Sequence, residues 1–99
     1  LTESAILEKL DHSNEEALQQ FQIALEIYRN SKDSHGEVST LKNISIVYRN
    51  QRKYHESLKV LKEALQIVEE RKLDYGSNTF YISMGNTYDE ALGVFGVLI

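Results

Sequence analysis

Residues 41–65, LKNISIVYRNQRKYHESLKVLKEAL, contain two amphipathic segments separated by a short polar break at residues 51–53. Apolar or small side chains recur three and four residues apart on both sides of the break, which is the spacing of one face of an α-helix. In the first segment they are Leu41, Ile44, Ser45 and Tyr48, and in the second they are Ser57, Leu58, Leu61, Ala64 and Leu65. Because the break is so short, the stretch predicts two antiparallel helices that pack against each other.

Small residues lie where these two helices would cross. Ser45, Ser57 and Ala64 would let the backbones approach closely, while Leu61 and Tyr48 would fill the space between them. We therefore expect Tyr48, Leu61 and Ala64 to be buried in the core of the pair.

The whole chain repeats itself at an offset of 40 residues. Among the positions that keep the same residue, Glu16, Leu18, Ala24, Leu25, Ile27, Lys32, Gly36 and Tyr48 correspond to Glu56, Leu58, Ala64, Leu65, Ile67, Lys72, Gly76 and Tyr88. Other positions exchange residues of similar character, such as Phe21 with Leu61 and Ile44 with Met84. A period in this range marks a repeat protein, in which each unit buries its apolar face only by stacking on its neighbours.

The order of large and small residues from Leu41 to Leu65 resembles the tetratricopeptide repeat, a helix-turn-helix unit of about 34 residues. The resemblance covers about Ser13 to Leu92, and the period of 40 residues is similar to that of an extended variant of this repeat. It implies an α-solenoid with a concave groove that binds proteins or peptides, as in the scaffold proteins that use such repeats. The resemblance is specific for the fold, but it says little about the particular function.

We expect an all-α fold, with antiparallel helix pairs stacked as a short α-solenoid of about five helices. Cap-forming residues at 11–14 predict a turn between helices at about 3–10 and 13–30, and further helices are expected at about 34–50, 54–71 and from Tyr75 onward. Ser13 with Glu16 and Ser34 with Glu37 have capping-box spacing, and Asp74 is the expected cap of the last helix. On that helix Tyr81, Met84, Gly85 and Tyr88 are the expected core face.

The 99 residues predict a single domain. It comprises a partial repeat at 1–30, a full repeat at 34–72 and a partial repeat at 75–99. Because the chain starts at Leu1 and not at methionine, we expect it to be a piece of a longer protein.

Tyr88 fits two places in the repeat. It lies 40 residues after Tyr48, at the end of a first helix, and 34 residues after Tyr54, at the start of a second. Either a turn is missing between Tyr88 and Asp89, or two helices are fused into one. The tail beyond is apolar on all sides, so it either packs on the preceding helices or joins two chains through Leu92, Phe95 and Leu98. The second alternative would make the domain a homodimer.

Composition argues against several functions. The chain has no cysteine, 11 basic and 15 acidic residues and a formal charge of −4, so we expect no disulfides, no metal site and no nucleic-acid surface. The apolar tail is shorter than the roughly 20 residues that span a bilayer, so we expect no membrane association. The three histidines are far apart, and no serine has a plausible base, so we expect neither an enzyme nor a cofactor. A cytoplasmic location is the corresponding expectation.

In the repeat family the first helix of each unit lines the groove, and this assigns a candidate set of binding residues: Ser39, Lys42, Asn43, Ile46, Arg49, Asn50, Thr79, Ile82, Ser83 and Asn86. Asparagine side chains can satisfy the backbone of an extended peptide, and Lys42 and Arg49 can pair with its carboxylates. The competing interpretation is that both cations are ordinary solvated residues. We expect a non-catalytic protein or peptide interaction module, with a self-associating spacer as the alternative function.

Overall fold

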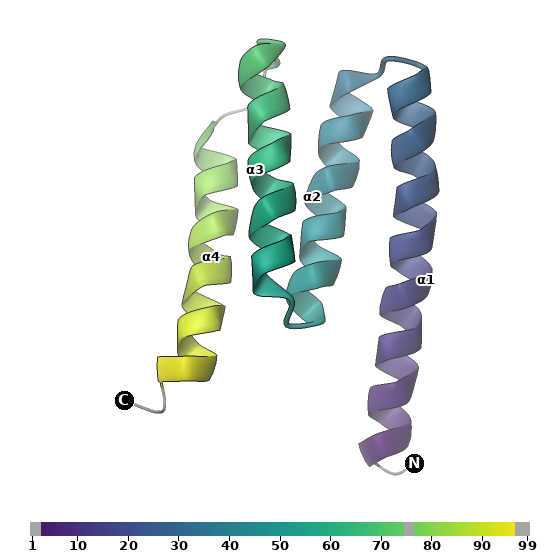
Figure 1. Ribbon diagram of the computed structural model, residues 1–99, viewed down its shortest axis with the longest axis vertical. Coiled ribbons are helices and arrows are strands. Elements are labelled where there is room, and N and C mark those ends of the chain that lie inside the picture. Colours follow the sequence, from purple (N-terminus) through teal and green to yellow (C-terminus); the bar gives the residue numbers. More distant parts are fainter. Residues whose placement is uncertain (1–2, 75–76, 97–99) are drawn as a thin grey trace.

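The computed structural model describes residues 3–74 and 77–96, and within these ranges all regular secondary structure is helical. Four helices follow one another: α1 (Glu3–Asn30), α2 (Ser34–Asn50), α3 (Tyr54–Glu70) and α4 (Ser77–Gly96). Each packs antiparallel beside the next, so they form one row in the order of the chain (Figure 1). The extents of 45 × 32 × 15 Å describe a thin layer. The predicted all-α, solenoid-like fold is confirmed.

Helix α1 differs from the prediction, because the turn expected at 11–14 is absent and Glu3–Asn30 is one helix of 28 residues. Ser13 consequently caps no helix. The cap-forming residues lie on an exposed stretch, where water satisfies their side chains and each costs a helix only a few tenths of a kcal/mol. His12 and Glu16 also form an i,i+4 pair of 3.0 Å across the expected turn. The prediction was wrong because it relied on residues that favour helix caps, although residues 11–14 contain no glycine or proline that would end the helix.

The two fully described turns, after α1 and after α2, and the end of α3 share one backbone geometry. Lys32, Arg52 and Lys72 each have a positive φ, of 57°, 63° and 51°. The next residue then donates its N–H to a carbonyl five residues earlier: Asp33 to Tyr28, Lys53 to Tyr48 and Leu73 to Val68. This is the Schellman arrangement, which satisfies carbonyls at the end of a helix. It places the breaks where the polar residues at 31–34 and 51–53 predicted them.

The start of α2 is capped by Asp33 and not by Ser34. The Asp33 carboxylate accepts a hydrogen bond of 3.0 Å from the Gly36 N–H. Ser34 and Glu37, the predicted capping box, instead bond to the side chain of Arg71. The cap is therefore one residue earlier than predicted. The expected start of the last helix at Tyr75 lies outside the described residues, and Asp74 forms a bend before them.

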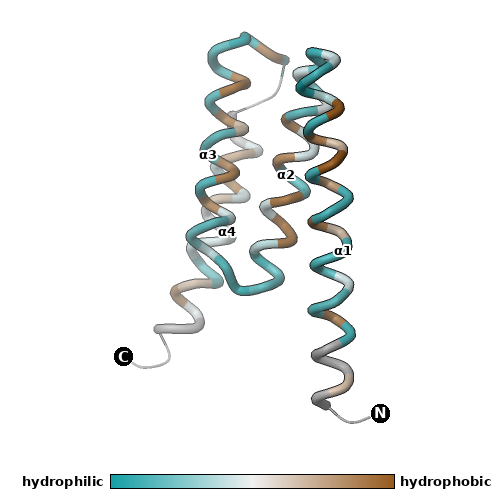
Figure 2. The backbone as a smooth tube through the Cα atoms, turned by 45° about the vertical axis from the view of Figure 1, so that its right-hand side comes forward, coloured by the Kyte–Doolittle hydropathy of each residue, from teal (hydrophilic) through white to brown (hydrophobic). Residues whose placement is uncertain are grey.

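The core lies along the row, where buried apolar residues of neighbouring helices form one cluster. Figure 2 marks the hydrophobic residues along each helix. Its central members are Val38, Leu41, Ile44, Leu61, Ala64, Leu65, Val68, Phe80 and Met84. Ser45 and Ser57 are buried where α2 and α3 cross, and the Ser57 hydroxyl donates a hydrogen bond of 2.8 Å to the Ser45 carbonyl. The predicted crossing, with small residues and Leu61 at its centre, is confirmed.

Helix α4 continues through Tyr88 and Asp89 without a turn. Its buried face consists of Phe80, Met84 and Thr87, whereas Tyr81 and Tyr88 are exposed and no atom lies within 4 Å of a Cβ built on Gly85. Met84 was predicted correctly, but the other three expected core positions were not. Helix α4 packs mainly on α3, so its covered side is the one that faces α3. This side differs from the core face that was predicted by analogy with α2.

Gly36 permits the close approach of α1 and α2, because a Cβ at this position would overlap the ring of Tyr28. We expect Gly36→Ala to lower the free energy of unfolding by about 1–3 kcal/mol, the usual cost of overpacking. Urea denaturation followed by circular dichroism measures it. Gly85→Ala is the matched control, since the new methyl group there meets nothing and should raise stability by up to about 1 kcal/mol. Equal effects of the two changes would contradict the close approach.

Candidate functional site

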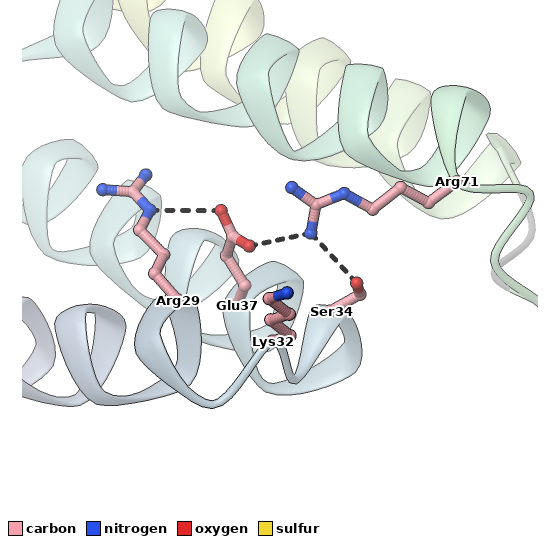
Figure 3. A pocket seen from close by; sticks show the side chains of 5 residues that line it. All are labelled: Arg29, Lys32, Ser34, Glu37 and Arg71. Carbon is pink, nitrogen blue, oxygen red and sulfur yellow. Dashed lines mark hydrogen bonds and ion pairs between the residues drawn. The ribbon is translucent and has the colours of Figure 1, made fainter.

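One hollow at the edge of the row, of about 510 Å³, is lined by charged side chains from the turn regions. Glu37 is buried at its centre between two arginines, with Arg29 Nε at 3.1 Å and Arg71 Nη1 at 3.0 Å from its two oxygens (Figure 3). Arg29 also reaches Glu63 at 2.9 Å, and Arg71 donates to Ser34. These pairs tie α1, α2 and the end of α3 together. We interpret the cluster as structural, because the arginines and the glutamates neutralise one another.

A second hollow, of about 180 Å³, lies on the face where α2 and α4 flank α3. Its lining comes from three helices: Lys42, Ser45, Ile46 and Arg49 of α2, Ser57 and Leu61 of α3, and Ser83, Asn86 and Thr87 of α4. The first and third of these helices run in the same direction (Figure 1). They form two parallel walls, and α3 closes the bottom between them.

The floor of this groove is buried and its hydroxyl groups have hydrogen-bond partners. Ser45, Ser57, Leu61 and Thr87 are all buried. The Ser45 hydroxyl donates to the Lys42 carbonyl at 2.6 Å, and the Thr87 hydroxyl donates to the Ser83 carbonyl at 2.9 Å. Polar groups that could bond to a ligand therefore lie on the walls and rim of the groove more than on its floor.

The structure brings five of the ten sequence-predicted groove residues together around this hollow: Lys42, Ile46, Arg49, Ser83 and Asn86. The other five, Ser39, Asn43, Asn50, Thr79 and Ile82, are exposed on the same two helices but do not line it. Ile46 and Ile82 are among the exposed large apolar side chains, so the walls are partly apolar. Asn86 adds an amide to one wall.

Both cations of the groove have partners within the chain. Lys42 Nζ lies 5.3 Å from the centre of the Phe80 ring, and Arg49 Nε lies 3.6 Å from Glu90 Oε1. Each contact joins α2 to α4. The Arg49–Glu90 pair is long and half-exposed, so it is weak, and a carboxylate from a ligand could compete with Glu90 for the guanidinium. Sequence reasoning missed these partners because they depend on how α4 is placed.

Of the residues predicted to join two chains, only Leu92 has a described side chain, and it is exposed. The side chain of Phe95 and all of Leu98 lie outside the described residues. Over residues 3–74 and 77–96, no group of three or more His, Cys, Asp or Glu side chains is arranged to hold a metal ion. None of the described helices combines the length and the apolar character needed to cross a membrane.

The arrangement of antiparallel helices with small residues at their crossings agrees with a comparison of the chain with protein-family models. The model described as Tetratricopeptide repeat matches residues 1–70. The chain belongs to the tetratricopeptide-repeat family. The match spans α1, α2 and α3 and ends before α4. No curated protein and no solved structure matches the chain significantly.

Helices α2 and α3 lie within the residues expected from the sequence to form the full repeat, and α1 and α4 lie within the two expected partial repeats. Repeats of this family typically mediate interactions between proteins and are non-catalytic.

Proposed function

We propose that the groove between α2 and α4 binds an extended segment of another protein and that the domain acts as a non-catalytic interaction module. The observation that carries the proposal is the hollow of about 180 Å³, whose lining includes five residues assigned to the groove from sequence alone. Family membership supports the same class of function.

The chemistry of the walls indicates what kind of segment would bind. Ile46 and Ile82 provide exposed apolar surface, and Asn43 and Asn86 can both donate to and accept from a peptide backbone. Lys42 and Arg49 place positive charge along the α2 wall. An extended segment with an apolar side chain beside an acidic one fits these walls best.

Removing groove amides should weaken binding. A library of octapeptides with varied acidic and apolar positions would provide the probe, and fluorescence polarisation of the selected peptide would measure affinity. We expect Asn86→Ala to weaken binding about 2- to 12-fold, because one net hydrogen bond is worth about 0.5–1.5 kcal/mol, and Asn43→Ala, which lies outside the hollow, to weaken it less. Asn30→Ala, at the exposed end of α1, is the matched control and should change nothing.

The Arg49–Glu90 pair makes the charge part of the proposal testable in two directions. Arg49→Gln should weaken binding of an acidic peptide, whereas Glu90→Gln should strengthen it by removing the competing carboxylate. Helix content should stay the same in both variants. Unchanged affinity in Asn43, Asn86 and Arg49 variants alike would place the binding site elsewhere.

A further inference from the structure

Two contacts cross the groove between α2 and α4, and the hollow of about 180 Å³ is lined by the α2 residue of each. The Lys42 ammonium group lies over the Phe80 ring, and Arg49 pairs with Glu90. Because Lys42 and Arg49 are seven residues apart on one helix, they are separated by about 10 Å along its axis. The space between them is a short socket, and we use that name for this hollow.

The size of the socket suits one side chain. A volume of about 180 Å³ has room for about six water molecules at roughly 30 Å³ each. Pockets for small organic ligands begin at about 300 Å³. A segment that lies in the groove can therefore insert a single side chain between Lys42 and Arg49, while its backbone stays above the socket.

The few polar groups on the floor of the socket are hydrogen-bond acceptors. They are the hydroxyl groups of Ser45, Ser57 and Thr87, which are all buried. Each donates its only proton to a backbone carbonyl, at 2.6, 2.8 and 2.9 Å respectively. A hydroxyl group that donates keeps lone pairs with which it can still accept. A side chain that fills the socket must therefore bring a donor to this floor.

Three classes of side chain fit such a floor poorly. An apolar side chain would displace water from the three hydroxyl oxygens without replacing its hydrogen bonds. A carboxylate only accepts, so its lone pairs would face theirs. Lysine or arginine would add a positive charge between Lys42 and Arg49, and among the described residues only Arg49 of these two has a carboxylate partner. A neutral donor remains.

A side-chain amide has groups for both the floor and the rim. Its NH₂ group provides two donors for the floor hydroxyls, and its oxygen can accept from the Lys42 ammonium group or the Asn86 amide, which both line the socket. A serine or threonine hydroxyl provides only one proton and fills less of the space. The amide is therefore the neutral side chain that satisfies most of the lining.

We propose that the socket recognises the side chain of an asparagine or glutamine in the bound segment. This inference rests on the proposed function of the groove, and it adds a neutral amide to the acidic and apolar side chains that the walls favour. The acidic side chain remains at the rim, where it competes with Glu90 for Arg49. The amide is the part of the segment that reaches the hydroxyl groups of α2, α3 and α4.

Peptide substitution tests the inference on the unchanged protein. Among octapeptides that bind the groove, one position should be enriched in asparagine or glutamine. Replacing that residue by methionine should weaken binding about 2- to 12-fold, the ratio that one net hydrogen bond gives, and glutamate or lysine should weaken it at least as much. Fluorescence polarisation measures each affinity.

The outcomes separate this inference from the proposed function. Peptides that respond to Arg49→Gln but show no preference for an amide at any position overturn the inference and leave the function of the groove standing. A preference for serine or threonine equal to that for the amides also overturns it. If no octapeptide binds, the proposed function and the inference fail together.

Thr87→Val locates the amide on the floor, because it removes one acceptor and keeps the branched shape of the side chain. The Thr87 hydroxyl bonds to a carbonyl of its own helix, so circular dichroism should show unchanged helix content. The preference for the amide peptide over its methionine variant should fall about 2-fold or more. Thr79→Val is the matched control, since Thr79 is exposed on the same helix and does not line the socket. An unchanged preference in Thr87→Val, or an equal loss in Thr79→Val, overturns the assignment.

Discussion

Leu61→Ala is expected to lower the free energy of unfolding by about 2–5 kcal/mol. Leu61 is 1% exposed, at the centre of the crossing between α2 and α3, and it also belongs to the floor of the groove. Removing its branched end leaves a cavity that rigid neighbours cannot fill. Because a domain of this size has a total stability of about 5–15 kcal/mol, the loss should bring the chain close to unfolding at 37 °C.

Urea denaturation followed by far-ultraviolet circular dichroism measures this loss, and Ile23→Ala is the matched control. Ile23 carries a side chain of the same volume on α1 but is 61% exposed, so its truncation should cost at most about 0.5 kcal/mol. If the two variants had equal stability, Leu61 would not be at the centre of the core.

The centre of the fold followed from local periodicity. The expected bounds of 34–50 and about 54–71 agree with α2 and α3, because both helices are covered on two sides and their apolar stripes are regular. The polar breaks before and after α2 also fell at the right residues, although no glycine marks them. Lys32 and Arg52 take the left-handed conformation there, supported by hydrogen bonds to the preceding helix.

The errors arose where a residue's role depends on distant parts of the chain. Glu37 has the spacing of a capping residue, but its partners Arg29, in the last turn of α1, and Arg71, at the end of α3, hold its buried carboxylate in a partly exposed ion-pair cluster. The family resemblance was enough to assign the groove to two helices. It could not predict the contacts of Lys42 with Phe80 and of Arg49 with Glu90, because these contacts form only when α4 packs in place.

The face of α4 is the most instructive of these cases. Matching Tyr88 to Tyr48 implied that Tyr81 is buried as Leu41 is, but Leu41 belongs to a helix that packs on both α1 and α3. Among the described residues α4 packs mainly on α3, so the copied face is exposed and the buried face is the one toward α3. The repeat correctly identified equivalent positions, whereas burial depends on which neighbours are present.

Phe80→Ala should therefore detach α4 from the rest of the molecule. Phe80 is 0% exposed and packs α4 against the core, with the Lys42 ammonium group over its ring. Truncation of a buried phenylalanine costs about 3–5 kcal/mol. In a row of helices that contact only their neighbours, such a loss at one end is expected to unfold that end first. Hydrogen exchange should show amides of residues 79–92 losing protection while those of α2 and α3 keep it.

Tyr81→Ala is the adjacent control. Tyr81 is exposed in the single chain, so its loss should leave the protection of α4 nearly unchanged. If Tyr81→Ala released α4 as fully as Phe80→Ala, the face copied from α2 would be the buried one and the packing of α4 described above would be wrong. If only Phe80→Ala releases α4, the side of α4 that carries Phe80 is the one that holds it against α3.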